Sequence, residues 1–106
     1  MAATDFYPLT VAAVEPETDS AIKVSFTVPD ALVDVFRYHQ GQYLTLQSKV
    51  GDETVRRSYS ICSGINDPAM QVAIKRVEGG VFSNFANDAL SAGDTIEVMP
   101  PQGSFY

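Results

Sequence analysis

The feature that most constrains the fold of this chain is a series of short segments in which apolar and polar residues alternate. Residues 21–28 are the clearest case, because Ile22, Val24 and Phe26 are each separated by one polar residue. Successive side chains of a β-strand point to opposite faces, so this pattern predicts a half-buried strand. The whole sequence predicts six strands, at residues 6–15, 21–28, 43–50, 53–62, 69–77 and 95–99.

Turn residues separate the predicted strands and leave room for one helix. Gly51-Asp52 predicts a tight hairpin between the third and fourth strands, and residues 31–36 predict a single helical turn. The main helical stretch follows Gly79-Gly80, with Ser83 predicted as its N-cap. Its apolar stripe consists of Phe82, Phe85, Ala86, Ala89 and Leu90. The predicted fold is all-β, a small six-stranded antiparallel Greek-key barrel with one short inserted helix, because closure hides the strand edges.

Length, charge and cysteine content restrict the class of protein. The 106 residues predict one domain, residues 1–106, with a single hydrophobic core. No segment approaches the roughly 20 apolar residues of a transmembrane helix, and the N-terminus has no secretory signal. The single cysteine, Cys62, fits a reducing compartment, so a cytoplasmic location is predicted. The net charge of −6 argues against binding to nucleic acid or to an anionic membrane.

Four of the seven Lys and Arg residues form two adjacent pairs, Arg56-Arg57 and Lys75-Arg76, which we call the basic dyads. In an acidic chain, this concentration of cations is suited to a compact anion such as a phosphate. The alternative is that each dyad simply directs one side chain into solvent. The dyads alone leave both interpretations open.

The segment Arg57-Ser58-Tyr59-Ser60 ends the fourth predicted strand. Residues two apart share a strand face, so Arg57 and Tyr59 are predicted to project together. The arginine fork suits a phosphate, and the tyrosine ring suits stacking on another aromatic ring. A serine at the strand end can hydrogen-bond a ring heteroatom. Together these groups suit a phosphate-bearing aromatic cofactor, whereas the four-residue string alone is also typical of a surface strand.

The second candidate segment is the glycine pair before the predicted helix, Gly79-Gly80. Glycines let the backbone approach a ligand closely, and the amides at a helix N-terminus attract an anion through hydrogen bonds and the helix dipole. The alternative is an ordinary strand-to-helix turn with a serine cap. Taken alone, the segment is compatible with either structure.

Five motifs, in this order, resemble those of one known family over nearly the whole chain. They are Gly41-Gln42-Tyr43, Arg57-Ser58-Tyr59-Ser60-Ile61, Ile74-Lys75-Arg76, Gly80-Val81-Phe82-Ser83-Asn84-Phe85 and Pro101-Gln102-Gly103-Ser104-Phe105. On these motifs the chain is similar to the FAD-binding domain of the ferredoxin–NADP reductase superfamily. One departure is Gln40, which stands where proline is common in that family.

The resemblance implies a role for each matching residue. Arg57 would bind flavin phosphate, and Tyr59 would stack against the isoalloxazine or ribityl region. Ser60, the predicted catalytic residue, would bond the flavin nitrogen that receives hydride, and Ser58 completes this part of the site. The backbone groups implied to hold the ribityl–pyrophosphate tail are those of Ile74, Lys75, Gly80, Val81, Phe82 and Ser83. The flavin carries the electron chemistry while the protein supplies position and tuning, and no metal ligand is predicted.

Residues 73–88 and 98–103 resemble one branch in particular, the reductase component of phenylacetyl-CoA ring epoxidases. This branch implies an enzyme that passes electrons from NAD(P)H through FAD and a 2Fe–2S cluster to an oxygenase partner. The chain has neither a Gly-rich dinucleotide turn nor a four-cysteine set, so the NAD(P)-binding and ferredoxin-like domains are expected elsewhere in the full-length protein. This fragment alone is predicted to be inactive in NAD(P)H oxidation. The alternative is a non-enzymatic interaction barrel without a cofactor.

Two single residues are predicted to have no chemical role. His39 is the only histidine, and no second ligand or nucleophile lies near it in sequence, which predicts a loop or surface position. Cys62 ends the fourth predicted strand and is predicted to be a small buried side chain.

Overall fold

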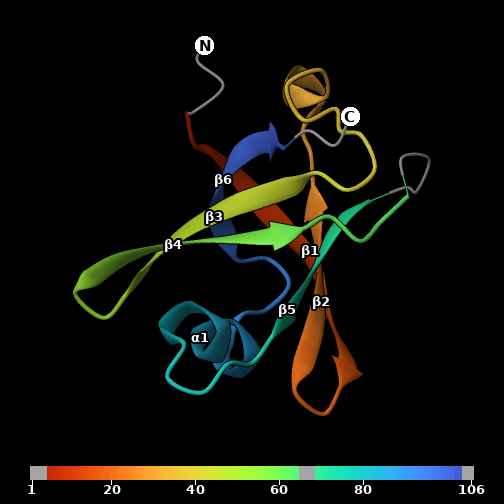
Figure 1. Ribbon diagram of the computed structural model, residues 1–106. Coiled ribbons are helices and arrows are strands. Elements are labelled where there is room, and N and C mark those ends of the chain that lie inside the picture. Colours follow the sequence, from red (N-terminus) through yellow and green to blue (C-terminus); the bar gives the residue numbers. More distant parts are fainter. Residues whose placement is uncertain (1–4, 65–68, 104–106) are drawn as a thin grey trace.

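The computed structural model describes residues 5–64 and 69–103, so Ser104 and Phe105 of the last predicted motif lie outside it. Within the described residues, six strands form one sheet: β1 (Tyr7–Thr18), β2 (Ala21–Thr27), β3 (Tyr43–Val50), β4 (Glu53–Ser60), β5 (Met70–Lys75) and β6 (Thr95–Gln102). A short 3-10 turn, η1 (Asp30–Leu32), follows β2, and helix α1 (Val81–Ala89) lies between β5 and β6 (Figure 1). The predicted all-β class with one inserted helix is confirmed.

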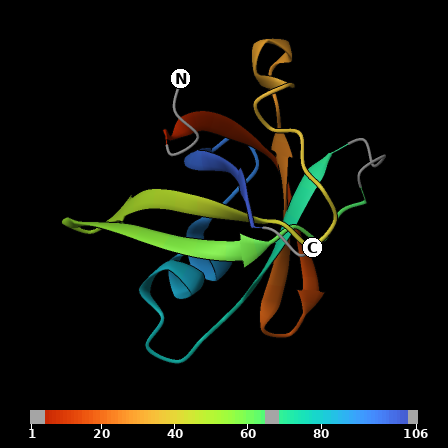
Figure 2. The same cartoon turned by 45° about the horizontal axis from the view of Figure 1, so that its top comes forward.

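The strands lie in the order β4-β3-β6-β1-β2-β5, and each neighbouring pair is antiparallel. β6 returns beside β1, which gives the Greek-key order β6-β1-β2-β5. The predicted hairpin turn joins β3 to β4, and Gly51 has a positive φ of 64°, which favours glycine at this position. Figure 2 shows this hairpin extending away from β2 and β5.

The sheet does not close, in contrast to the predicted closed barrel. β4 and β5 stand at the two ends of the strand order, and the described residues join them by one isolated bridge, Ile61 to Val72. One backbone hydrogen bond also runs from the Cys62 N–H to the Gln71 carbonyl at 2.9 Å. Beyond this junction the two strands diverge toward α1, which contacts β3, β4 and β5 (Figure 1). Packing of the helix therefore replaces a backbone ladder in this part of the fold.

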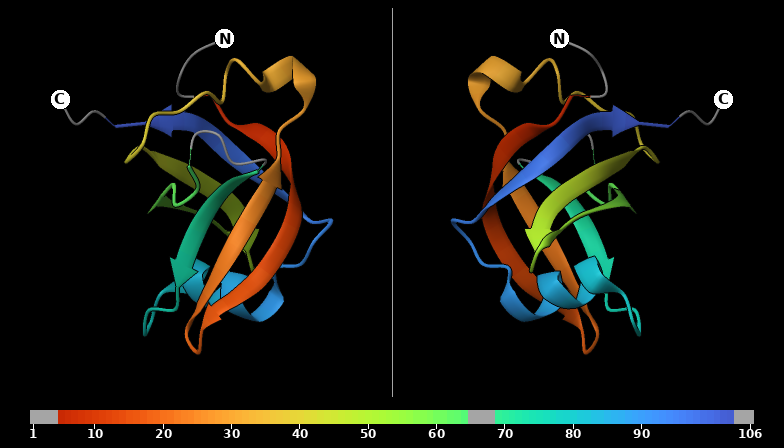
Figure 3. Two further views of the ribbon diagram at one scale, coloured as in Figure 1. Left: turned by 90° about the vertical axis from the view of Figure 1, so that its right-hand side faces the viewer. Right: turned by 90° about the vertical axis from the view of Figure 1, so that its left-hand side faces the viewer.

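The core lies inside the curved sheet, with α1 across one end (Figure 3). The alternation predicted for residues 21–28 is observed, since Ile22, Val24 and Phe26 are all buried. α1 buries Phe82 and Ala86 against the sheet, and burying an aromatic side chain contributes about 1.5–3 kcal/mol. Among the described residues, no helix has the length and apolarity that crossing a bilayer requires.

Several strand ends differ from the predicted ones. β1 continues through Pro16 to Thr18, with an irregular register near its end, and β4 and β5 each end before the predicted residue. β6 passes through Pro100 and Pro101 to Gln102, although prolines cannot donate to a strand ladder. The described pairing of β6 with β3 steps from Met99 to Gln102 at a register shift, so neither proline is needed as a donor there.

Candidate cofactor-binding site

The opening between β4 and β5 holds a pocket of about 220 Å³. β4 forms one side of this pocket, and the end of β5, the following turn and α1 form the other. The lining residues are Arg57, Ser58, Tyr59, Lys75, Val77, Gly80, Phe82 and Ser83. All of them except Val77 belong to the set predicted from the sequence, so the fold brings the two predicted segments together.

β4 supplies Arg57 and Tyr59 from its inner face. Val55 on the same face and Ile61 just beyond the strand are buried, whereas Arg57 is exposed and Tyr59 is half-buried. The two pocket residues are more accessible than their neighbours because the sheet is open beside them. Arg57 and Tyr59 therefore share one face, as strand alternation predicts.

The Tyr59 ring lies next to a ring of α1. Its ring centroid lies 5.9 Å from that of Phe82, with an angle of 34° between the ring planes, and Phe82 is fully buried. Burial raises the pKa of the Tyr59 hydroxyl above its ordinary value, and the nearby positive charge of Arg57 opposes this rise. The result is a neutral aromatic ring on an apolar support, whose exposed part suits a flat ligand.

Two cations face the pocket from different strands, Arg57 from β4 and Lys75 from the end of β5. Arg57 Nη1 donates to the carbonyl of Arg56 at 2.6 Å, which fixes the direction of the guanidinium. The hydroxyl groups of Ser58 and Thr45 share a hydrogen bond of 2.9 Å between β4 and β3. In the described part of the chain, no cluster of three or more His, Cys, Asp or Glu side chains could hold a metal ion.

The turn before α1 differs from the prediction, because Ser83 is not the N-cap. α1 begins at Val81, and its N-cap is Gly80, which makes no side-chain cap hydrogen bond. Ser83 is buried in the first turn of the helix, where its hydroxyl accepts from the Val77 N–H at 3.1 Å and donates to the Gly80 carbonyl at 3.4 Å. Gly79, with a φ of 74°, turns the chain into the helix earlier than a serine cap would.

Gly80 is a position that only glycine fits without rearrangement. A Cβ atom there would lie 2.6 Å from the Ser83 hydroxyl oxygen and 3.0 Å from the Val77 carbonyl oxygen. The Gly80 N–H donates to that same Val77 carbonyl at 2.8 Å, and the Gly80 carbonyl accepts from the Asn84 N–H at 3.1 Å. Both polar groups of this residue are therefore engaged within the turn.

The N-terminal amides of α1 lie at the edge of the pocket. The first helical hydrogen bond runs from Asn84 to Gly80, so the N–H groups of residues 81–83 precede it. The first turn of this helix contains no acidic residue, and its N-cap supplies no side-chain acceptor. Together with the helix dipole, these amides favour an anion between α1 and the two pocket cations.

Three predicted residues are not among the described residues that line the pocket. Ser60 is exposed at the end of β4, opposite Tyr43 and close to the junction of β4 with β5. The side chain of Ile74 is fully buried, and its carbonyl accepts from the Asn87 amide at 3.2 Å. Val81 is 43% exposed at the first position of α1.

Single-residue predictions had mixed outcomes. Val77 lines the pocket but was not predicted as a site residue. It lies two residues after Lys75, and this strand-like spacing was the pattern in the sequence that could have identified it. Cys62 is exposed, so its predicted burial is wrong; its neighbours Ile61 and Ser63 are buried, and the alternating chain turns Cys62 outward. His39 is exposed in the loop after η1, as predicted.

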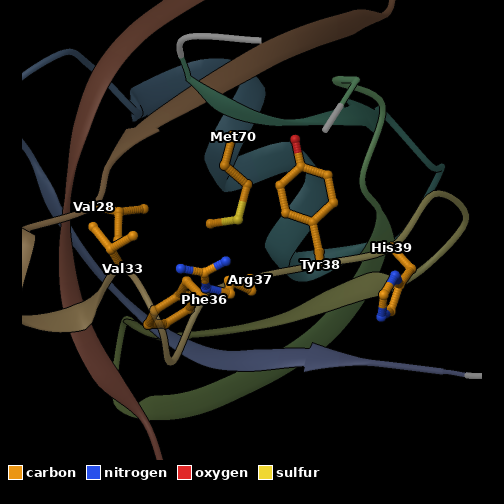
Figure 4. Close-up of a pocket in the computed structure, with 7 residues that line it drawn as sticks. All are labelled: Val28, Val33, Phe36, Arg37, Tyr38, His39 and Met70. Carbon is orange, nitrogen blue, oxygen red and sulfur yellow. The ribbon is translucent and has the colours of Figure 1, made fainter. Parts of the chain in front are cut away.

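Another pocket, of about 420 Å³, lies beside η1 (Figure 4). The ribbon of η1 and that of α1 lie at opposite ends of the molecule (Figure 1). This pocket is lined by Val28, Val33, Phe36, Arg37, Tyr38, His39 and Met70. Arg37 pairs with Asp34 at 2.9 Å, and the Tyr38 hydroxyl donates to the Gly64 carbonyl at 2.6 Å. No sequence motif predicted this pocket, and none of the predicted site residues lines it.

Comparison with known proteins identifies relatives that are oxidoreductase components. One subunit of the 1,2-phenylacetyl-CoA epoxidase from Escherichia coli (strain K12) is 45% identical over 102 residues, which cover 96% of this chain and 29% of the relative. The ferredoxin reductase component of 3-ketosteroid-9-alpha-monooxygenase from Rhodococcus rhodochrous is 44% identical over 100 residues, covering 92% of this chain and 28% of that protein. The chain thus spans less than a third of the length of these relatives.

Solved structures share the same fold. Phthalate dioxygenase reductase, described as a modular structure for electron transfer from pyridine nucleotides to [2Fe-2S], has a TM-score of 0.75 and 28% identity, covering 95% of this chain and 31% of its own. A ferredoxin NADP+ reductase from Neisseria gonorrhoeae with bound FAD and NADP has a TM-score of 0.79 and 21% identity, covering 94% of this chain and 39% of its own.

These findings confirm the superfamily that the sequence motifs predicted and FAD as the family's cofactor, and the relatives are components of oxidoreductases. They give no support to the alternative of a cofactor-free interaction barrel. The model of the family described as "Oxidoreductase FAD-binding domain" matches residues 8–106. That match covers nearly the whole chain, and the chain therefore belongs to the oxidoreductase FAD-binding domain family.

Proposed function

We propose that this chain is the FAD-binding part of an NAD(P)H-dependent electron-transfer reductase, with FAD held in the opening between β4 and β5. The observation that carries this proposal is that Arg57, Tyr59 and Lys75 converge on the N-terminus of α1. FAD combines a diphosphate with a flat ring system, and the pocket offers donors for the first and an aromatic surface for the second. When bound, FAD supplies hydride acceptance and electron release.

The phosphate end of the site is assigned to groups on both sides of the opening. The Arg57 fork and the Lys75 ammonium bind phosphate oxygens from β4 and β5. The N–H groups of residues 81–83 donate from the helix, where no carboxylate competes in the first turn. Gly80 allows close approach but supplies no donor, because its N–H already bonds Val77.

The ring end is assigned to Tyr59 and Ser60. Tyr59 orients the flavin by stacking, supported from behind by the buried Phe82 ring. The Ser60 hydroxyl, at the exposed end of β4, donates to the flavin nitrogen that receives hydride. Ser58 contributes through its backbone, because its hydroxyl is bonded to Thr45.

The β5 backbone is assigned a smaller part than the sequence motifs imply. The carbonyl of Ile74 accepts from the Asn87 amide at 3.2 Å, so it is committed to α1. Ile74 lies opposite Ile22 in the antiparallel ladder, in register with the hydrogen-bonded pair of Ser20 and Arg76, so its N–H faces β2. Lys75 is therefore assigned the contacts of this strand, through both its backbone and its ammonium group. The side chain of Ile74 stays in the core, where it is fully buried.

For the full-length protein we propose a nicotinamide-binding domain and a ferredoxin-like 2Fe–2S domain, with an oxygenase such as a phenylacetyl-CoA epoxidase as the electron acceptor. The 45% identity to a component of such an epoxidase supports this assignment, as does the modular reductase of the same fold. We also propose a cytoplasmic location, since a lone cysteine fits a reducing compartment. On its own the chain oxidises NAD(P)H slowly, because nothing in the described pocket is assigned to orient the nicotinamide.

The test is reconstitution of the 106-residue chain with FAD. After incubation and gel filtration, the visible absorption of oxidised flavin should elute with the protein. Titration should show tighter binding of FAD than of riboflavin, which shares the ring but carries no phosphate. A folded chain that remains colourless at saturating FAD would contradict the proposed function.

A further inference from the structure

The two cations of the second basic dyad, Lys75 and Arg76, make different contacts. Lys75 lines the pocket, whereas the Arg76 side chain crosses to α1. Arg76 Nη2 donates to Asp88 Oδ1 at 2.5 Å, and Nη1 donates to Asn84 Oδ1 at 3.0 Å and to Asp88 Oδ2 at 3.3 Å. Asn84 and Asp88 are four residues apart on one helix face, so one guanidinium spans a full turn of α1. The Arg76 N–H is itself anchored to the Ser20 carbonyl at 2.6 Å.

Further polar contacts attach the same side of α1 to the end of β5. The Asn84 amide donates to the Val77 carbonyl at 3.1 Å, and the Asn87 amide donates to the Ile74 carbonyl at 3.2 Å. A nine-residue helix is marginal in isolation, so tertiary contacts must set its direction. The guanidinium of Arg76 is the charged member of this set of contacts.

We propose that Arg76 is a positioning residue of the cofactor site: through Asp88 and Asn84 it directs the N-terminal amides of α1 toward the phosphates that Arg57 and Lys75 bind. This inference rests on the proposed function. Arg76 is assigned no direct phosphate contact, because three of the five N–H groups of its guanidinium are directed to Asn84 and Asp88 on the helix. It is also not among the residues that line the pocket, and the Asp88 carboxylate neutralises its charge.

A small change in the direction of α1 would move its N-terminal amides by a distance that matters for hydrogen bonding. A helix of nine residues is roughly 13 Å long, so a tilt of about 10° at one end displaces the other end by roughly 2 Å. Donor–acceptor distances for N–H···O bonds span only about 2.7–3.2 Å. A small loss of alignment would therefore disengage the amides of residues 81–83 from a phosphate, while Tyr59 on β4 would keep its place.

The test compares FAD with riboflavin, which lacks the phosphates that α1 is proposed to bind. Arg76→Gln and Asp88→Asn should each weaken FAD binding by about three- to thirtyfold and leave riboflavin affinity within about twofold. The double variant should weaken FAD binding no more than Arg76→Gln alone, because the two residues act as one unit. Arg37→Gln is the matched control, since it breaks another exposed Arg–Asp pair, with Asp34, beside η1; it should change neither affinity.

Three outcomes would overturn the proposal. If Asp88→Asn leaves FAD binding unchanged or strengthens it while Arg76→Gln weakens it, Arg76 contacts phosphate directly. If FAD and riboflavin affinities fall equally and the thermal midpoint drops, the pair merely stabilises the fold. Unchanged FAD affinity in Arg76→Gln would contradict the positioning role alone, whereas a wild-type chain that binds no FAD would contradict the proposed function itself.

Discussion

The two basic dyads are alike in sequence, and each divides its cations in the same way. Arg57 and Lys75 face the opening between β4 and β5, whereas Arg56 and Arg76 do not line it. Successive side chains of a strand point to opposite faces, which accounts for this division within each dyad. Each dyad therefore supplies one residue to the pocket and one to the surrounding structure.

Arg56 and Arg76, the dyad residues that do not line the pocket, make different contacts. Arg56 Nε donates to Gln47 Oε1 at 2.6 Å, and its guanidinium carbon lies 4.8 Å from the centre of the Phe6 ring. These contacts stay on the sheet, between β3, β4 and the N-terminal segment. Arg76 instead joins the sheet to α1 through Asp88. The comparison predicts that changes at Arg56 affect stability alone, and that changes at Arg76 reach the cofactor.

The largest expected effect is on FAD binding by Arg57→Ala. A hydrogen bond to a charged group contributes about 1.5–3 kcal/mol, so this variant should bind FAD more weakly by that amount. The control is Arg56→Ala, which removes the neighbouring cation and should leave FAD affinity unchanged. Titration of each variant with FAD measures the two affinities. Equal FAD affinities of Arg57→Ala and Arg56→Ala would contradict the assignment of Arg57 to the site and of Arg56 to the surrounding structure.

Lys75→Ala should have a smaller effect on FAD binding, about 0.5–1.5 kcal/mol, because an exposed ammonium is a flexible point charge without a fixed fork. The difference from wild type should shrink as salt is added, since exposed charges are screened. FAD titrations at low and high ionic strength measure this. An effect of Lys75→Ala larger than that of Arg57→Ala would reverse the assigned order of the two pocket cations.

Arg56→Ala should lower the free energy of unfolding by about 0.5–1 kcal/mol, the value for an exposed cation–π contact. Urea unfolding measures this loss, and Phe6→Leu should cause a similar one, because it removes the ring and keeps an apolar side chain. The two losses should not add in the double variant. Additive losses would show that the Arg56–Phe6 contact contributes nothing by itself.

The parts of the fold that depend on local pattern could be predicted from the sequence. Ile22, Val24 and Phe26 alternate with polar residues and are all buried, and the turn at Gly51 lies where the hairpin was predicted. Closure of the barrel could not be predicted in this way. Closure depends on how far β4 and β5 pair beyond Ile61 and Val72. In the folded chain α1 packs against both strands, in place of further pairing between them.

The site shows the same division between local signal and tertiary context. Its motifs identified most of the lining residues, but not which of their polar groups are available. Residue preferences rank serine above glycine as an N-cap, yet Ser83 bonds Val77 and the cap is Gly80. The carbonyl of Ile74 is likewise occupied by Asn87. These partners come from segments that meet only in the folded chain, so sequence spacing cannot reveal them.

The smallest expected effect is the acid dependence of the Arg76–Asp88 pair. The hydrogen bond from Arg76 holds the pKa of the Asp88 carboxyl below its ordinary value of 3.8. A carboxyl whose folded-state pKa is depressed stabilises the fold above its unfolded pKa, and this contribution is lost as pH falls through the folded pKa.

The thermal midpoint of wild type should therefore exceed that of Asp88→Asn by a constant amount near neutral pH. The difference should begin to shrink once the pH falls below 3.8, because Asp88 is then protonated in the unfolded state, and it should vanish below the lower folded-state pKa, where Asp88 is protonated in both states. The effect is small because both side chains are partly exposed and screened by solvent. A difference between wild type and Asp88→Asn that grows as pH falls would show that Asp88 is not the charged partner of Arg76. The contrast between the dyads would then rest on Asn84 alone.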